Sequence, residues 1–156
     1  MGKSLDYTQF EKLLANFKGV QKDYDAFIRS FLTEMGMRAM AQTKKLTPVD
    51  TGRLRNAWEL SDVYRKGDEL YIVLFNPVEY ASFIEDGHMQ RNRFVPGSFL
   101  GGKFEYIPGY PFGMVLQNKW IPGYHMARIS ITKIEQEMPR RFDAAFQKFI
   151  SRLEEI

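Results

Sequence analysis

Apolar residues recur at intervals of three and four in the first third of the chain, as on one face of a helix. Residues 5–18 follow this pattern from a capping box at Asp6, and Gly19 is expected to end that short helix. The same period resumes at residue 21 and continues to residue 45, which predicts a helix of about 25 residues, about 37 Å long. Proline lacks the N–H of the helical hydrogen-bond ladder and disfavours helical backbone in the residue before it, so Thr47-Pro48 is expected to stop the helix. The pattern predicts two N-terminal helices in succession.

A β-hairpin is expected in the middle of the chain. Residues 60–65 and 70–75 favour extended structure and flank the turn signal Lys66-Gly67-Asp68-Glu69, which predicts two antiparallel strands. Before them, Asp50 can cap a short helix that runs through residues 53–58.

Another short helix is expected after the hairpin. Asn76-Pro77-Val78-Glu79 combines an N-cap, a proline at the first helical position and a glutamate three residues after the cap, and Gly87 stands where a C-terminal cap would be. Tyr80 and Phe83 lie on one side of this helix. Together with Trp58, they are expected in the core rather than at a contact.

The C-terminal region predicts a long helix. Residues 126–131 are ambiguous between strand and helix, and Thr132 and Glu135 then have capping-box spacing. The apolar positions after them keep one helical phase across Pro139, which favours a kinked helix over two independent ones. These positions are Ile134, Met138, Phe142, Ala145, Phe146, Phe149 and Leu153.

Residues 88–125 hold six of the 12 glycines, four of the seven prolines and eight aromatic side chains. An aromatic residue, a β-branched residue, proline and glycine recur in that order at residues 94–97, 106–109 and 120–123. Proline followed by glycine suits a type II turn, and the residues before it favour extended chain. We expect a turn-rich extended arm over residues 88–124 that includes an irregular β-ribbon.

Composition agrees with one globular domain over residues 1–156. The chain has no cysteine, which excludes disulfide scaffolds, thiol nucleophiles and zinc ribbons, and it has no apolar run of the roughly 20 residues that a membrane span requires. The order of elements predicts an α+β fold, in which long N-terminal helices and a C-terminal helix pack on a small antiparallel sheet with the arm as an extension.

The net charge of +3 is unevenly distributed. Residues 47–87 carry four basic and eight acidic side chains, whereas residues 88–125 carry four basic and one acidic. An acidic middle is therefore followed by a mildly basic arm.

Little in the sequence points to catalysis. Glu85, Asp86 and His88 could hold a metal, but carboxylates at a helix end followed by glycine and histidine are more often a solvated terminus. The usual constellation of three converging ligands is not visible. The Gly-x-Ser-x-Gly, Walker A and Gly-x-Gly-x-x-Gly motifs are absent. We expect a protein that is not an enzyme and uses no metal and no cofactor.

The basic residues of the arm allow a second interpretation. Arg91, Arg93, Lys103 and Lys119 alternate with aromatic residues, as on surfaces that bind single-stranded nucleic acid. Four basic residues among 38 give too little positive charge for strong binding to phosphates. An arm that packs on its own domain or on a neighbouring subunit is therefore favoured. A nucleic-acid-binding accessory protein stays the alternative.

Three segments resemble a known family. They are Thr-Pro-Val-Asp-Thr-Gly-Arg-Leu-Arg-Asn-Ala-Trp at residues 47–58, Tyr-Ala-Ser-Phe-Ile-Glu-Asp-Gly-His at 80–88 and Trp-Ile-Pro-Gly-Tyr-His-Met at 120–126. In this order, between a long amphipathic helix and a C-terminal helix, they resemble the tail-component family of tailed phages named for gene product ten of phage Hong Kong 97, whose members are also met as tail-completion or head-tail joining proteins.

The resemblance implies a structural, non-enzymatic virion protein. Such a protein would be made in the host cytoplasm and would form a homo-oligomeric ring, usually sixfold, at the neck. Its partners would be copies of itself, the portal-side connector or head-completion protein, and the tail-tube or tail-terminator protein. DNA would only pass through the channel, and no membrane would be involved. The length and aromatic content of residues 88–121 depart from the family pattern.

The candidate interface residues follow from this picture. Asp50 would cap a helix that presents Arg53 and Arg55 to carboxylates such as Glu85 or Asp86, within the chain or across a subunit boundary. The alternative is that Asp50, Gly52 and Arg53 only fix the turn between helix and sheet. In the arm, the candidates are Phe94, Tyr106, Tyr110 and Trp120.

Overall fold

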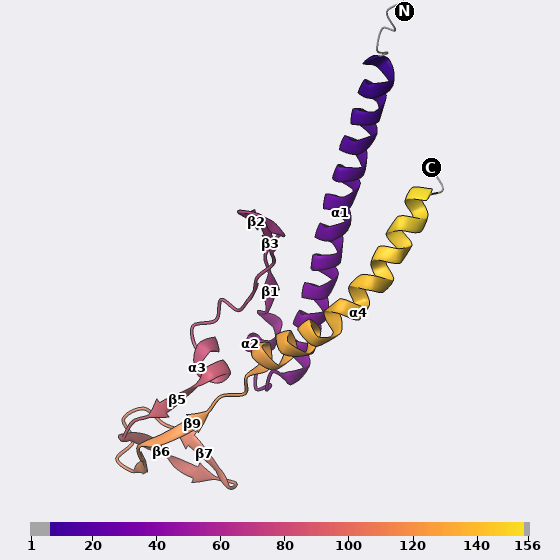
Figure 1. The fold of residues 1–156 in the computed structure, drawn as a ribbon. Helices are drawn as coiled ribbons and strands as arrows, with labels where there is room; N and C mark the ends of the chain where they lie inside the picture. The colour runs from indigo at the N-terminus through magenta and orange to yellow at the C-terminus, as the bar shows by residue number, and fades with distance from the viewer. Residues whose placement is uncertain (1–6, 155–156) are drawn as a thin grey trace, which may run out of the picture.

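A computed structural model describes the backbone of residues 7–154 and the side chains of residues 15–153. The fold is α+β, as predicted: two long helices pack on each other, and short antiparallel strands extend away from them (Figure 1). The elements are α1 (Tyr7–Leu46), α2 (Arg53–Asn56), β1 (Glu59–Leu60), β2 (Tyr64–Lys66), β3 (Glu69–Tyr71), β4 (Leu74–Phe75), α3 (Ala81–Asp86), β5 (Gly87–Gln90), β6 (Arg93–Leu100), β7 (Lys103–Tyr106), β8 (Gly113–Leu116), β9 (Lys119–Pro122) and α4 (Met126–Glu154).

The N-terminal region forms one helix, so the predicted break at Gly19 is wrong. Helix α1 runs unbroken for 40 residues, and Gly19 lies inside it with nothing within 4 Å of the position of a Cβ. A glycine weakens a helix by about 1 kcal/mol but keeps its backbone N–H, so it does not interrupt the hydrogen-bond ladder as proline does. The predicted stop before Pro48 is confirmed, because α1 ends at Leu46. The predicted cap at Asp6 lies outside the described residues.

The C-terminal region is also a single helix. Helix α4 begins at Met126, so the ambiguous residues 126–131 are helical and a helix start at Thr132 is wrong. Pro139 lies inside α4, which curves along its length and runs antiparallel to α1 (Figure 1). The expected continuous helix across Pro139 is therefore confirmed.

Aromatic rings join the two long helices. Phe27 of α1 stacks on Phe149 of α4 at 4.8 Å between ring centroids, and Phe31 meets Phe142 edge to face at 5.3 Å. Deeper along the same seam, a buried cluster contains Phe31, Met35, Ala39 and Ile134. The helical phase that predicted α4 thus marks its contact with α1.

The predicted hairpin is present in two parts. Strand β1 pairs with β4, and β2 pairs with β3 around the turn at Gly67. The hairpin lies along α1, where Leu60 and Ile72 fill the space next to Gly36: a Cβ added at this glycine would meet their side chains at 3.3 and 2.8 Å.

A second core lies below the hairpin, where α2, α3 and the start of α4 meet. It contains Leu54, Trp58, Val78, Ala81 and Met126. The expected core position of Trp58 is confirmed by its 5% exposure.

The expected core positions of Tyr80 and Phe83 are wrong, because they are 37% and 53% exposed. The helix after the hairpin also starts later than expected. Asn76 accepts a hydrogen bond from the Val78 N–H at 3.1 Å and so forms a turn, and α3 begins only at Ala81.

The arm follows α3 and projects from the helical body on the side away from both termini (Figure 1). Its strands form two antiparallel sheets, in the orders β5-β9 and β7-β6-β8, which confirms the expected β-ribbon. Because the arm and the upper part of α1 project, the chain exposes 12355 Å². A compact monomer of this mass would expose about 8,100 Å².

Candidate functional site

The base of the arm is a close crossing of two chain segments. Tyr124 donates its backbone N–H to the carbonyl of Ile84 at 2.8 Å, and His125 donates to that of Glu85 at 3.0 Å. Gly123 lies in this crossing, and a Cβ there would stand 2.2 Å from the Glu85 carbonyl oxygen. Gly87, the C-cap of α3, has φ +85° and is equally confined, since its Cβ would meet the Ile121 carbonyl at 2.6 Å. Both glycines therefore have a steric role, and the predicted C-cap is confirmed.

Glu85 ties this crossing to the last helix. Its two carboxylate oxygens accept hydrogen bonds from the backbone N–H groups of Ala127 and Arg128, both at 3.0 Å. These are first-turn donors of α4 that have no partner within the helix, and a carboxylate is favoured at that end of the helix dipole. Asp86 lies 3.7 Å from the Arg128 guanidinium. Glu85 thus fixes the direction of α4 relative to the arm, and the exposed pair of Asp86 and Arg128 adds little.

The three possible metal ligands, Glu85, Asp86 and His88, are each engaged in another contact. Glu85 is used as a cap, Asp86 faces Arg128, and His88 packs edge to face on Phe83 with ring centroids 5.5 Å apart. Within residues 15–153, no three His, Asp or Glu side chains converge as metal ligands. None of the described helices is long and apolar enough to cross a membrane.

Beyond the base, the arm is a long two-stranded ribbon. Residues 87–90 pair with 119–122, and residues 93–96 pair with 113–116 in the same register. Between the two ladders, Asn92 and Asn118 exchange hydrogen bonds, each backbone N–H donating to the other side-chain oxygen at 2.7 Å. Ten residues of each strand give a ribbon about 33 Å long.

At Pro96-Gly97, strand β6 changes its partner from β8 to β7. The Gly97 N–H donates to the carbonyl of Phe112 at 2.9 Å, while the Pro96 carbonyl accepts from the Ile107 N–H at 3.1 Å. A Cβ on Gly97 would lie 2.1 Å from the Glu105 carbonyl oxygen, so this crossing admits only glycine. The predicted turn at this position is wrong.

Only one of the three proline-glycine pairs makes the expected turn. At Pro108-Gly109, the Tyr110 N–H donates to the Ile107 carbonyl at 3.1 Å and Gly109 has φ +75°, as a type II turn requires. Pro122 ends strand β9, and the glycine after it lies in the crossing at the base. In two of the three places the glycine serves close packing of two backbones.

Most residues of the predicted interface near residue 50 shape the connection from α1 to α2. Gly52 is the N-cap of α2 with φ +83°, and Asp50 makes no cap, so that prediction is wrong. Arg55 donates to the Thr47 carbonyl at 2.9 Å. Arg53 lies 3.8 Å from Glu79.

The structure thus places neither arginine against Glu85 or Asp86 within the chain. A role of these four residues across a subunit boundary stays a prediction. The four aromatic candidates of the arm, Phe94, Tyr106, Tyr110 and Trp120, are all exposed.

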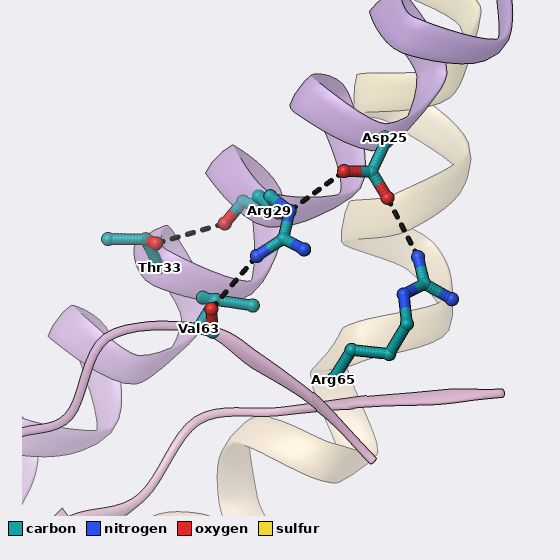
Figure 2. A network of polar contacts seen from close by, with 5 residues as sticks. All are labelled: Asp25, Arg29, Thr33, Val63 and Arg65. Atoms are coloured by element: carbon teal, nitrogen blue, oxygen red, sulfur yellow. Dashed lines mark hydrogen bonds and ion pairs between the residues drawn. The ribbon is translucent and has the colours of Figure 1, made fainter. Parts of the chain in front are cut away.

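One polar network was not anticipated from the sequence. Asp25 of α1 accepts hydrogen bonds from Arg29 and from Arg65 of the hairpin, both at 2.8 Å, and Arg29 also donates to the Val63 carbonyl at 2.9 Å (Figure 2). The hydrogen bond from Arg29 has the largest effect and, together with the charge of Arg29 and the bond from Arg65, it holds the pKa of Asp25 below its usual 3.8, although desolvation, the second-largest effect, raises it. The spacing of four between Asp25 and Arg29 was visible in the sequence, but the contact with the hairpin was not. The network fixes the hairpin against α1.

Comparison with known proteins identifies the family. The model of the HK97-gp10-like family, described as "Bacteriophage HK97-gp10, putative tail-component", matches residues 11–87. The phage-like element PBSX protein XkdI of Bacillus subtilis (strain 168) is 32% identical over 118 residues, which cover 67% of this chain and 70% of that protein. The chain belongs to the HK97-gp10-like family. The uncharacterized protein YqbI of the same strain is 28% identical over 123 residues, with the same two shares. No solved structure matches the chain.

Membership makes this HK97-gp10-like protein a structural component of the phage tail. The family match contains the hairpin and α3 and ends at Gly87, the first residue of the arm. The match therefore covers most of α1, the hairpin and α3, whereas the ribbon beyond its base and α4 lie outside it.

Proposed function

We propose that this protein is a neck or tail-completion subunit that forms a homo-oligomeric ring, sixfold in symmetry, between the portal-side connector and the tail. The observation that carries the proposal is the uncovered arm. Its three-stranded sheet has large apolar side chains exposed, among them Phe99 at 65% and Val115 at 66%. A small sheet of this kind gains stability from a layer packed on it, and a partner subunit supplies that layer.

The size of the exposed surface supports the same proposal. The chain exposes about 4,200 Å² more than a compact monomer of its mass, whereas a stable interface buries about 800 Å² on each partner. The excess is large enough for two neighbours in a ring and for a contact with an adjoining ring. The partners are then copies of this chain, the connector or head-completion protein, and the tail-tube or tail-terminator protein.

In this proposal, residues 1–156 act as one assembly domain and residues 88–124 as its arm. The protein works by binding other proteins and carries out no reaction, and DNA only passes through the channel. It is made in the host cytoplasm and stays in the virion neck.

Electron microscopy of assembled particles tests the proposal. A ring of this chain between the portal-side connector and the tail is expected, and particles made without the protein should carry heads and tails that are not joined. Particles that lack the protein, together with a purified chain that stays monomeric, would refute the proposed function.

A further inference from the structure

The two faces of the arm differ in composition. Since the pairing register is the same on both sides of Asn92, alternate residues share a face along the whole ribbon. One face, called here the arm face, contains exposed apolar side chains and two arginines, and no carboxylate. Its exposed members are Met89, Arg91, Arg93, Phe99, Tyr106 and Trp120. The opposite face also exposes apolar side chains, Phe94, Leu100 and Val115, and it differs in charge, because it carries Lys103, Glu105 and Lys119.

The hairpin presents an exposed surface of opposite charge. Leu60 and Ile72 point toward α1, so the residues that alternate with them face outward. This hairpin face combines exposed apolar rings and side chains with carboxylates. It contains Glu59, Tyr64, Glu69, Tyr71, Val73 and Phe75, with Lys66 as its cation beside Glu69. The pairing shifts by one residue between the two ladders, so Tyr64 and Lys66 share this face with Tyr71 and Glu69, and Asp62 is exposed in the unpaired segment between β1 and β2.

The charges on both faces lack partners of opposite sign. Among the residues that the structure describes, no ion pair involves Arg91 or Arg93 of the arm face, nor Glu59 of the hairpin face or the neighbouring Asp62. Arginine suits bidentate pairing with carboxylates, and apolar side chains surround the charges on both faces. The two faces are complementary in charge and in apolar character.

These two faces cannot meet within one chain. The hairpin extends along α1, whereas the arm projects in the opposite direction from α3 (Figure 1). A contact between them therefore needs two copies, and it joins different surfaces of the two. Such a head-to-tail interface produces a closed ring when its rotation closes.

We propose that the arm face of one copy docks on the hairpin face of the next copy, with Arg91 and Arg93 opposite Glu59 and Asp62. The inference rests on the proposed function and assigns the ring contact to named surfaces. Each copy contributes one arm face and one hairpin face, so its two contacts bury about 1,600 Å² of its surface at the standard interface size, well within the observed excess.

Charge reversal on the full chain tests this contact. The arm variant carries Arg91→Glu and Arg93→Glu, and the hairpin variant carries Glu59→Arg and Asp62→Arg. Each alone should raise the concentration at which half of the chain is assembled by at least about tenfold, because like charges then face each other. Analytical ultracentrifugation and native mass spectrometry measure this concentration, and circular dichroism checks that the variants are folded.

Restoration is the decisive part of the experiment. The chain that carries all four substitutions should assemble as the wild type does. An equal mixture of the arm and hairpin variants should also assemble, into species that contain both variants in equal numbers, because every contact in an alternating ring is again between opposite charges.

Two matched controls change the same amount of charge elsewhere. Lys103→Glu with Lys119→Glu alters the opposite face of the arm, and Glu135→Lys with Asp143→Lys alters exposed positions of α4. Neither should change assembly by more than about twofold, since distant exposed charges are screened by salt.

Several outcomes would overturn the docking contact. The first two are a wild-type chain that is monomeric at every concentration and an arm variant that assembles at the wild-type concentration. The other two are a control variant whose assembly is weakened as much as that of the arm variant, and a four-substitution chain that stays monomeric. If rings form and the arm variant still assembles, the proposed function survives and only the docking contact fails. If the arm variant loses affinity for a labelled single-stranded oligonucleotide while its self-association is unchanged, the arm face binds nucleic acid instead.

Discussion

Replacing Gly123 with alanine should destabilise the protein by about 3 kcal/mol. The added Cβ would stand 2.2 Å from the Glu85 carbonyl oxygen, and relief to an ordinary contact requires the two segments to separate by about 1 Å. That movement exceeds the tolerance of the hydrogen bonds from Tyr124 and His125, at 2.8 and 3.0 Å, and strains the Glu85 cap on α4. At about 1 kcal/mol for each of these three contacts, the total is about 3 kcal/mol.

Urea unfolding followed by circular dichroism measures this loss. In a thermal scan the same loss should lower the midpoint by about 6 to 12 °C for a chain of this length. Hydrogen exchange should show faster exchange at the amides of Tyr124 and His125 than in the wild type. Gly19→Ala is the matched control, because this glycine also has no positive φ and has open space around it. An unchanged midpoint for Gly123→Ala would refute the described crossing at the base of the arm.

Three further predictions concern the body. Gly19→Ala should raise helicity and stabilise the N-terminal part of α1 by about 0.5 to 1 kcal/mol, measured by circular dichroism; a helix that broke at this residue would show no gain. Thr47→Val should lower the free energy of unfolding, measured in urea, by about 2 kcal/mol, because the buried indole N–H of Trp58, which lies 2.9 Å from the threonine oxygen, then has no acceptor. A decrease below about 0.5 kcal/mol would contradict this hydrogen bond. Since the folded pKa of Asp25 is lowered, its contribution is present above its unfolded pKa near 3.8 and is lost as the pH falls through the folded value. Asp25→Asn should therefore reduce the loss of stability below pH 4 in a series of urea titrations, and an identical acid dependence would contradict the network with Arg29.

Elements with strong periodicity could be predicted from the sequence. The apolar positions of α4 kept one phase across Pro139, and they form the seam with α1 that includes the contacts of Phe142 and Phe149. The turn signal at Gly67 located the hairpin. Gly19 misled the prediction of α1 because a glycine lowers local helix stability by a small amount, which the helix tolerates when its neighbours favour it.

The proline-glycine pairs show why local rules could not predict the arm. The same dipeptide is a turn at residues 108–109, part of strand β6 at 96–97 and the entry to a crossing at 122–123. What distinguishes these positions is the backbone that approaches each glycine from a distant part of the chain. The residues next to each glycine in the sequence do not specify which distant backbone approaches it.

The sequence predicted which kinds of residue the candidate interface contains, but not how these residues are arranged in space. The exposed aromatic residues of the arm could be expected from their density, whereas the cap of Glu85 on α4 spans more than 40 residues of sequence and could not. Likewise, the link from Asp25 to Arg65 became visible only when the hairpin lay against α1. Long-range polar contacts depend on the packing of elements, which periodicity does not specify.

The way the ribbon is anchored determines how the arm responds to mechanical tension. Both of its strands, residues 87–96 and 113–122, leave the body at the same crossing and continue to the same distal sheet. A pull on the distal sheet is therefore carried by two covalent backbones in parallel, which are already extended, while the hydrogen bonds between the strands lie across the direction of pull. Loss of some of these bonds would change the shape of the arm but would hardly lengthen it. A bound arm would thus behave as a short, stiff tether between its body and whatever holds its tip.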